Sequence, residues 1–178
     1  MNRLSIYLMC LGTLLSQATL AQTNWTITDE YTIAFSGSRA EGTFTGLEGA
    51  ILFDEDNLNA SRFAVYIDPA TISTGNKTKD KHARGDSWLD VKKYVKIGFV
   101  SDQIQKTSEG YTAKGLLSMH GTSKEVQIDF TFIQTSENAG LFKGKMKVNR
   151  EDYGIDGPLF SFVVGEEFEI DISVNVKK

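Results

Sequence analysis

Histidine is the side chain that most often carries acid–base or metal chemistry near neutral pH, and this chain offers two, His82 and His120. Neither histidine has a second histidine or a cysteine at ligand spacing. A zinc site usually needs three or four such ligands. We therefore expect no metal site, and we interpret His82 as a residue of a helix surface or a portal.

Nucleophilic and paired-acid chemistry also lack the required spacing. Ser36 lies in the sequence Phe-Ser-Gly-Ser, which does not match the Gly-x-Ser-x-Gly turn of a serine hydrolase. The acid pairs at 29–30 and 166–167 lie beside predicted strand starts, where adjacent side chains point to opposite faces. We therefore expect that the protein is not an enzyme. A hydrolase with an unrecognised site is the most distant alternative.

The charged residues exclude one class of partner and leave another open. The net charge is -4 at pH 7, whereas duplex binding calls for a basic face, so no nucleic acid partner is expected. One locally basic zone contains Lys77, Lys79, Lys81, Arg84, Lys92, Lys93 and Lys96. We favour a solvated helix face as its interpretation. The alternative is a transient membrane-surface contact, in which anionic lipid attracts each nearby cation by about 1 kcal/mol.

Strands must position whatever this chain binds, because apolar and polar residues alternate along most of it. The alternating runs fall near residues 25–35, 41–53, 63–67, 97–99, 111–119, 126–132, 142–148 and 168–176. About eight such strands favour an all-β fold, which is an antiparallel lipocalin-like β-barrel or, failing that, a sandwich. The interior of an eight-stranded barrel has room for side chains or for one small ligand, and alternation does not separate these outcomes.

A short helical crossover interrupts the strands between Asn76 and Tyr94, where the alternation stops and charged residues take over. Asn76 is suited to cap the start of a helix. Long connections of this kind are usually functional. Because a closed barrel has no sheet edge to open, we expect this crossover to gate the barrel, with Trp88 and Leu89 as apolar cover.

Residues 1–21 have the pattern of a signal peptide. Arg3 precedes an apolar run over residues 4–15, and Ala21 ends a segment suited to cleavage. A helix that spans a membrane needs about 20 apolar residues, and this run is shorter. The single cysteine, Cys10, lies inside it. We therefore expect residues 22–178 to form one cysteine-free domain that is periplasmic or secreted.

A series of motifs carries a family resemblance. In chain order they are Thr74-Gly75-Asn76, Lys79-Asp80-x-His82, Trp88-Leu89-Asp90-Val91, Lys93-Tyr94, Gly115-x-Leu117-x-Met119-x-Gly121 and Asn149-Arg150-x-Asp152-Tyr153-Gly154-Ile155. In these motifs the chain resembles the YceI family over nearly all of the expected mature domain. The resemblance implies a lipocalin-like barrel that holds a polyisoprenoid, an isoprenoid quinone or another long amphiphile. It also implies no catalysis, and no cofactor beyond such a bound lipid.

The alternation and the resemblance together predict one set of ligand-binding side chains. They are Ile33, Phe35, Phe44, Phe53, Phe63, Val65, Trp88, Leu89, Ile97, Phe99, Leu117, Met119, Phe130, Phe132, Met146 and Ile170. A hollow barrel with this lining would hold a long apolar molecule for carriage or sequestration. In the alternative interpretation, the same side chains fill the core of a non-enzymatic structural or protein-interaction barrel.

The N-terminal pattern yields a first prediction, that cleavage after Ala21 releases a mature protein that begins at Gln22. The mass of protein recovered from the periplasm or the medium should equal that of residues 22–178. Cytosolic protein with an intact N-terminus would contradict the prediction of export.

Overall fold

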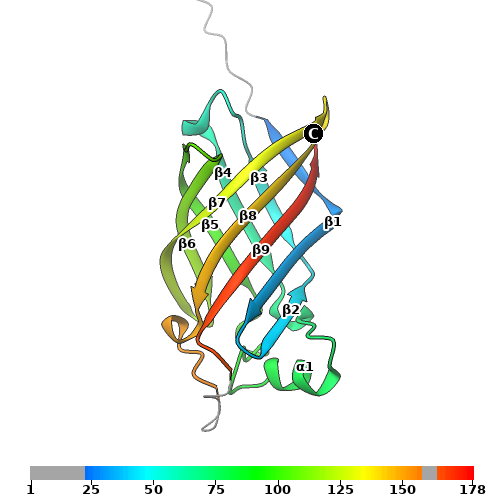
Figure 1. Ribbon diagram of the computed structural model, residues 1–178, viewed down its shortest axis with the longest axis vertical. Helices are drawn as coiled ribbons and strands as arrows, with labels where there is room; N and C mark the ends of the chain where they lie inside the picture. The colour runs from blue at the N-terminus through cyan, green and yellow to red at the C-terminus, as the bar shows by residue number, and fades with distance from the viewer. Residues whose placement is uncertain (1–22, 158–163) are drawn as a thin grey trace, which may run out of the picture.

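The computed structural model describes residues 23–157 and 164–178. Within these residues, nine antiparallel strands follow the order β2-β1-β3-β4-β5-β6-β7-β8-β9, and pairing of β1 with β9 closes the sheet (Figure 1). The strands are β1 Asn24–Gly37, β2 Ala40–Phe44, β3 Glu48–Leu52, β4 Arg62–Ile67, β5 Ile97–Lys106, β6 Tyr111–Met119, β7 Thr122–Ser136, β8 Ala139–Asn149 and β9 Glu167–Lys177. The predicted antiparallel β-barrel is confirmed.

Strands β2 and β3 share one position in the barrel wall. The C-terminal half of β1 pairs with β2, whereas Asn24 and Trp25 at its other end pair with β3. The run at 41–53, expected as one strand, is therefore two strands. Between them Gly46 has a φ of 72°, a left-handed conformation that glycine adopts without steric cost. Counted around the circumference, the described strands occupy eight positions, as the alternation predicted.

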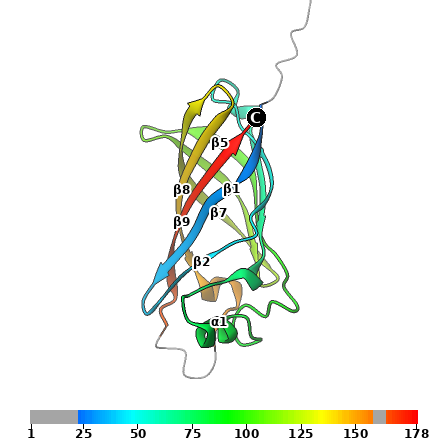
Figure 2. The same cartoon turned by 90° about the vertical axis from the view of Figure 1, so that its right-hand side faces the viewer.

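The crossover between β4 and β5 contains a 3-10 turn, η2 (Pro69–Thr71), and the helix α1 (Lys77–Ala83). The predicted cap is confirmed, because Oδ1 of Asn76 accepts hydrogen bonds from the backbone N–H groups of Thr78 and Lys79 at 3.0 and 3.1 Å. Figures 1 and 2 place α1 and the turn η3 (Arg150–Tyr153) at one end of the barrel and the C-terminus at the other. None of the helices in the described residues is long and apolar enough to cross a membrane.

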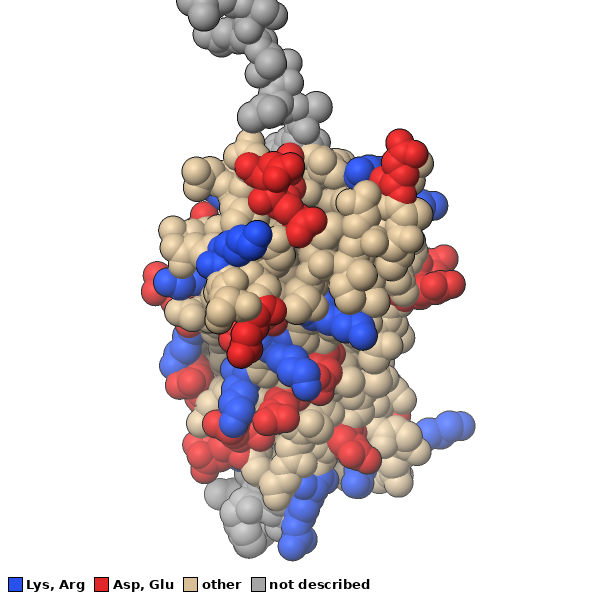
Figure 3. Space-filling view, turned by 45° about the horizontal axis from the view of Figure 1, so that its top comes forward, with Lys and Arg blue, Asp and Glu red and all other residues tan. Residues whose placement is uncertain are grey.

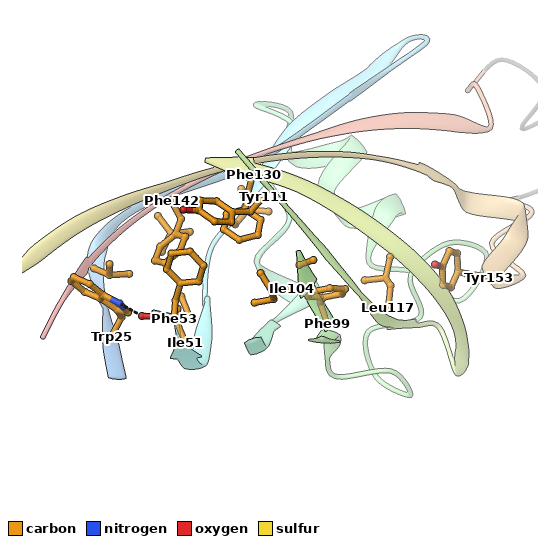
Figure 4. Packing of buried hydrophobic residues seen from close by; sticks show 14 of the residues in the cluster. Trp25, Ile51, Phe53, Phe99, Ile104, Tyr111, Leu117, Phe130, Phe142 and Tyr153 are labelled. Carbon is orange, nitrogen blue, oxygen red and sulfur yellow. Dashed lines mark hydrogen bonds between the residues drawn. The ribbon is translucent and has the colours of Figure 1, made fainter. Parts of the chain in front are cut away.

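Aromatic side chains fill the end of the barrel opposite α1. Phe53, only 1% exposed, lies at the centre, and its ring centroid is 5.2 to 6.2 Å from those of Phe63, Tyr111, Phe130, Phe132 and Phe142. Nε1 of Trp25 donates to the carbonyl of Phe53 at 3.0 Å (Figure 4). Full burial of one phenylalanine stabilises a fold by about 1.5–3 kcal/mol, so this aromatic cluster is a major source of stability.

Tyr111 brings a hydroxyl group into this aromatic cluster, and its surroundings change the pKa of that group. Burial, and after it a 2.6 Å hydrogen bond to Oε1 of Glu55, raise the pKa of Tyr111 to about 12. The tyrosine therefore stays neutral throughout the physiological range. It can pack its ring against Phe130 while its hydroxyl reaches the partner that a buried tyrosine needs.

The outer face of the barrel carries charges of both signs. Figure 3 shows lysines and arginines interspersed with carboxylates over the face that it draws. Strands β8 and β9 are joined across this outer surface by Lys145 with Asp171 and Lys147 with Glu167, each at 2.9 Å. Outward-facing residues of these strands are therefore solvated, and the inward-facing residues carry the apolar packing.

The two faces of β5 give a second prediction. Phe99 is 5% exposed and faces inward, whereas its neighbour Val100 is 46% exposed and faces outward. Phe99→Asp should lower the free energy of unfolding by several kcal/mol, because its carboxylate would be buried without a partner. Val100→Asp is the matched control and should melt close to wild type. Equal melting temperatures for the two variants would contradict the inward placement of Phe99.

Candidate functional site

Two adjoining cavities occupy the barrel between the aromatic cluster and α1. The larger, here called the mouth cavity, has a volume of about 590 Å³, and exposed residues such as Arg39 and Lys79 are part of its lining. The inner cavity has a volume of about 210 Å³, and among the described residues that line it Tyr66 alone has a polar side chain. Both cavities are lined by Phe35, Phe44, Leu89, Met119, Val148 and Ile170. The barrel is thus filled at one end and hollow toward the other.

Most of the side chains predicted for the ligand site line these cavities. The inner cavity contacts Ile33, Phe35, Phe44, Phe63, Val65, Leu89, Ile97, Phe99, Leu117, Met119, Phe130, Met146 and Ile170. Trp88 lines the mouth cavity. Phe53 and Phe132 line neither cavity, because they pack against each other in the aromatic cluster, with ring centroids 5.2 Å apart. That these residues contact a ligand stays a prediction.

The crossover is held against the barrel by backbone contacts that side chains reinforce. Thr43 of β2 and Ser73 exchange two backbone hydrogen bonds of 2.9 Å. This approach requires a glycine nearby, because a Cβ at Gly42 would lie 2.3 Å from the carbonyl oxygen of Ser73. Arg84 donates from Nε to the carbonyl of Ala70 at 2.7 Å and from Nη2 to that of Ile72 at 2.8 Å. These contacts fix the segment that brings Leu89 to the wall of both cavities, whereas its gating role stays a prediction.

Asp80 is the buried acid of this crossover. Its Oδ1 accepts hydrogen bonds from both the hydroxyl and the backbone N–H of Thr74, each at 2.7 Å. These two hydrogen bonds hold the pKa of Asp80 below its ordinary value, and the bond from the Thr74 hydroxyl has the larger effect. The charge of Arg84 acts in the same direction. The carboxylate therefore stays ionised and joins the start of the crossover to α1.

Arg150 is a buried cation on the wall of the mouth cavity. Its side chain is 7% exposed, and its guanidinium donates to the carbonyls of Gly165 at 3.2 Å and of Ile155. One end of the guanidinium lies 3.3 Å from the half-exposed carboxylate of Glu151, and its centre lies 5.5 Å from the ring of Trp88. Contacts from Glu151 in η3, Trp88 in the crossover and the carbonyl of Gly165 thus fix the position of the Arg150 guanidinium.

Several cavity residues were not among the predicted ligand-binding side chains. Val148 continues the alternation of β8 and could have been found from that signal. Arg39 lies in the two-residue turn between β1 and β2, and Arg150 lies in η3, so neither belongs to an alternating strand. Arg150 was part of a family motif, but nothing in the sequence linked it to the cavity.

The histidines occupy separate places. His82 lines the mouth cavity from α1. Nδ1 of His120 lies 3.2 Å from the carbonyl oxygen of Tyr153, and its ring centroid is 4.3 Å from that of Tyr94. In residues 23–157 and 164–178, no three His, Cys, Asp or Glu side chains are grouped so that they could hold a metal ion.

This barrel has known relatives in sequence. The sequence model of the YceI-like domain matches residues 19–176. The chain belongs to the YceI-like family. One YceI-like relative is a UPF0312 protein from Serratia proteamaculans, 31% identical over 139 residues that cover 75% of this chain and 71% of the relative. Another is a UPF0312 protein from Pseudomonas putida, 33% identical over 140 residues with the same coverage.

Solved structures share the fold of this chain. BcnA from Burkholderia cenocepacia superposes with a TM-score of 0.77 at 21% identity, covering 84% of this chain and 98% of BcnA. A polyisoprenoid binding domain from Saccharophagus degradans gives 0.68 at 12% identity, covering 88% of this chain and 98% of that domain. The closed barrel is therefore common to proteins that have diverged far in sequence.

A third prediction concerns the pH dependence of the YceI-like crossover. Since the pKa of Asp80 is lowered on folding, its contribution to stability is present above the ordinary aspartate pKa of about 4 and is lost as the pH falls through the lowered value. Asp80→Asn should therefore melt a few degrees below wild type at pH 7, and the difference should shrink in acid below about pH 4.

Asp86→Asn is the control for this prediction, because Asp86 is exposed on the same crossover. It should not change the melting temperature at either pH. If Asp80→Asn melts like wild type at pH 7, the hydrogen bonds from Thr74 do not stabilise the crossover.

Proposed function

We propose that this YceI-like protein is an exported, non-catalytic binding protein that holds a long apolar amphiphile for carriage or sequestration. The observation that carries this proposal is the adjoining pair of cavities, an apolar one inside the barrel and one with charged side chains at its mouth. This arrangement suits a molecule with an apolar tail and a polar head, since ligand sites combine apolar walls with a few placed polar groups.

The class of ligand is suggested by the fold family. The Saccharophagus neighbour is described as a polyisoprenoid binding domain, and its barrel matches over most of this chain. We therefore place a polyisoprenoid, an isoprenoid quinone or a related lipid first among the candidates. Export is proposed from the N-terminal pattern alone, because residues 1–21 lie outside the described residues.

A structural or protein-interaction barrel with a filled core is the competing proposal. The aromatic cluster around Phe53 fits it at one end of the barrel. The inner cavity argues against it at the other end, because a core filled for stability leaves few voids larger than a water molecule. The open volume that Met119 and Leu89 help to line is better suited to a guest molecule.

Transient contact with a membrane surface would bring the mouth to its ligand. The crossover that carries the basic zone lies at the mouth end (Figure 2). Val95 is 62% exposed and follows Lys92 and Lys93 closely, which gives the end of the crossover an apolar side chain beside two cations. Anionic lipid attracts each nearby cation by about 1 kcal/mol. We include this weak contact in the proposed function.

The fourth prediction tests whether the cavities hold a lipid. Native mass spectrometry of the purified protein should show a mass above that of the chain, and organic extraction should release a lipid that accounts for the difference. Met119→Trp should lose this added mass and still melt near wild type, because the indole would fill space that the ligand occupies.

Leu116→Trp provides the matched control, since Leu116 is 48% exposed on the outer face of the same strand. It should keep the added mass. Wild-type protein that carries no lipid after purification and takes none up from polyisoprenoid-containing vesicles would favour the filled, interaction-type barrel.

A further inference from the structure

The mouth cavity has a charge opposite in sign to that of the whole chain. Among the described residues, its lining includes the cations Arg39, Lys79 and Arg150 and one carboxylate, that of Glu41. The protein as a whole carries a net charge of -4 at pH 7. Hydrogen-bonding groups would be enough to bind a neutral polar head group. The excess of positive charge in the lining therefore favours an anionic one.

Arg150 is held in place before any ligand arrives. Its side chain is 7% exposed, and it donates to backbone carbonyls on two sides while it lies against Trp88. The carboxylate that faces it, that of Glu151, is 44% exposed and therefore screened by water. Its three guanidinium nitrogens donate to the carbonyls of Gly165, Ile155 and Val164, so Arg150 contributes to the mouth cavity chiefly a fixed positive charge, which attracts an anionic group.

Arg39 occupies a backbone conformation that side chains rarely adopt. Its φ is 63°, in a two-residue turn where glycine or asparagine is the usual residue. Non-glycine residues in such regions cost stability and concentrate at functional sites. In the described part of the chain, Arg39 forms no ion pair, and neither does Lys79 of α1. Both cations are thus available to a ligand.

We propose that the mouth cavity binds an anionic head group, a carboxylate or a phosphate, of the amphiphile whose tail occupies the inner cavity. This inference rests on the proposed function and adds the chemical class of the head. Arg39 and Lys79 bind the anion, the fixed charge of Arg150 attracts it, and the apolar wall shared by the two cavities directs the tail inward. Neutral amphiphiles with the same tail bind more weakly.

A pair of fluorescent probes with one tail tests the charge of the head directly. The probes are cis-parinaric acid and the alcohol of the same chain, titrated into the full mature protein after delipidation. The acid should bind about tenfold more tightly than the alcohol, since a hydrogen bond between charged groups is stronger than one to a neutral hydroxyl. Equal affinities would overturn the head-group inference while leaving the lipid-binding function intact. If neither probe binds, the proposed function itself fails.

Variants at the mouth separate charge from folding. Arg39→Gly and Lys79→Gln should each weaken the acid several-fold and leave the alcohol unchanged, with Lys92→Gln as an exposed control on the same crossover that lines neither cavity. Arg39→Gly should also melt at or above the wild-type temperature, because glycine tolerates the left-handed conformation. A variant that weakens acid and alcohol equally, or a control that weakens the acid as much, would overturn the inference.

Inorganic phosphate alone distinguishes a lipid head from a free anion. Without a tail, phosphate at millimolar concentration should not raise the melting temperature of the delipidated protein. If it stabilises wild type but not Arg39→Gly, the mouth is a site for small free anions and the head-group inference is overturned.

Discussion

Closure of the sheet through β1 and β9 is the constraint on which this molecule depends. The pairing runs from Thr26 opposite Lys177 to Gly37 opposite Phe168, with one irregularity after Ile27. Left open, the sheet would present two edges of unpaired backbone groups and expose its apolar face to water. Closure at eight positions also limits the width of the interior, so that large side chains fill it and smaller ones leave a small cavity.

The two ends of the barrel use that limited width differently. Around Phe53, rings pack edge to face and the interior is filled. Toward α1, the inward positions carry mostly aliphatic side chains such as Met119 and Leu117, and the space between them stays open. Stability and binding capacity are thus placed in different segments of one barrel. A mouth that carries strained or charged residues can be tolerated because the aromatic cluster supplies stability elsewhere.

The alternation of apolar and polar residues in the sequence predicted which side chains face the interior of the barrel, because that depends only on the local geometry of a strand. Successive side chains of a strand point to opposite faces in any context, so the alternation was enough to place Phe99 inside. The position of a residue along the barrel axis is not local. Phe53 and Phe132 continue the alternation as Phe99 does, yet they lie in the aromatic cluster, Phe132 in β7 and Phe53 directly after β3. Arg39 and Arg150 reach one cavity only because closure brings a hairpin turn and η3 to the same end, which no spacing in the sequence encodes.

The pairing of β1 with β9 also sets the order of events when the chain is made. Thr26 must wait for Lys177, nearly the whole length of the chain away, before the two can pair. Translation at about 5–20 residues per second leaves the first strand without this partner for on the order of ten seconds. During that time its apolar face and its free edge are open to other chains, and contacts so distant in sequence form slowly. A holding chaperone that covers the early strands would protect the nascent chain through that interval.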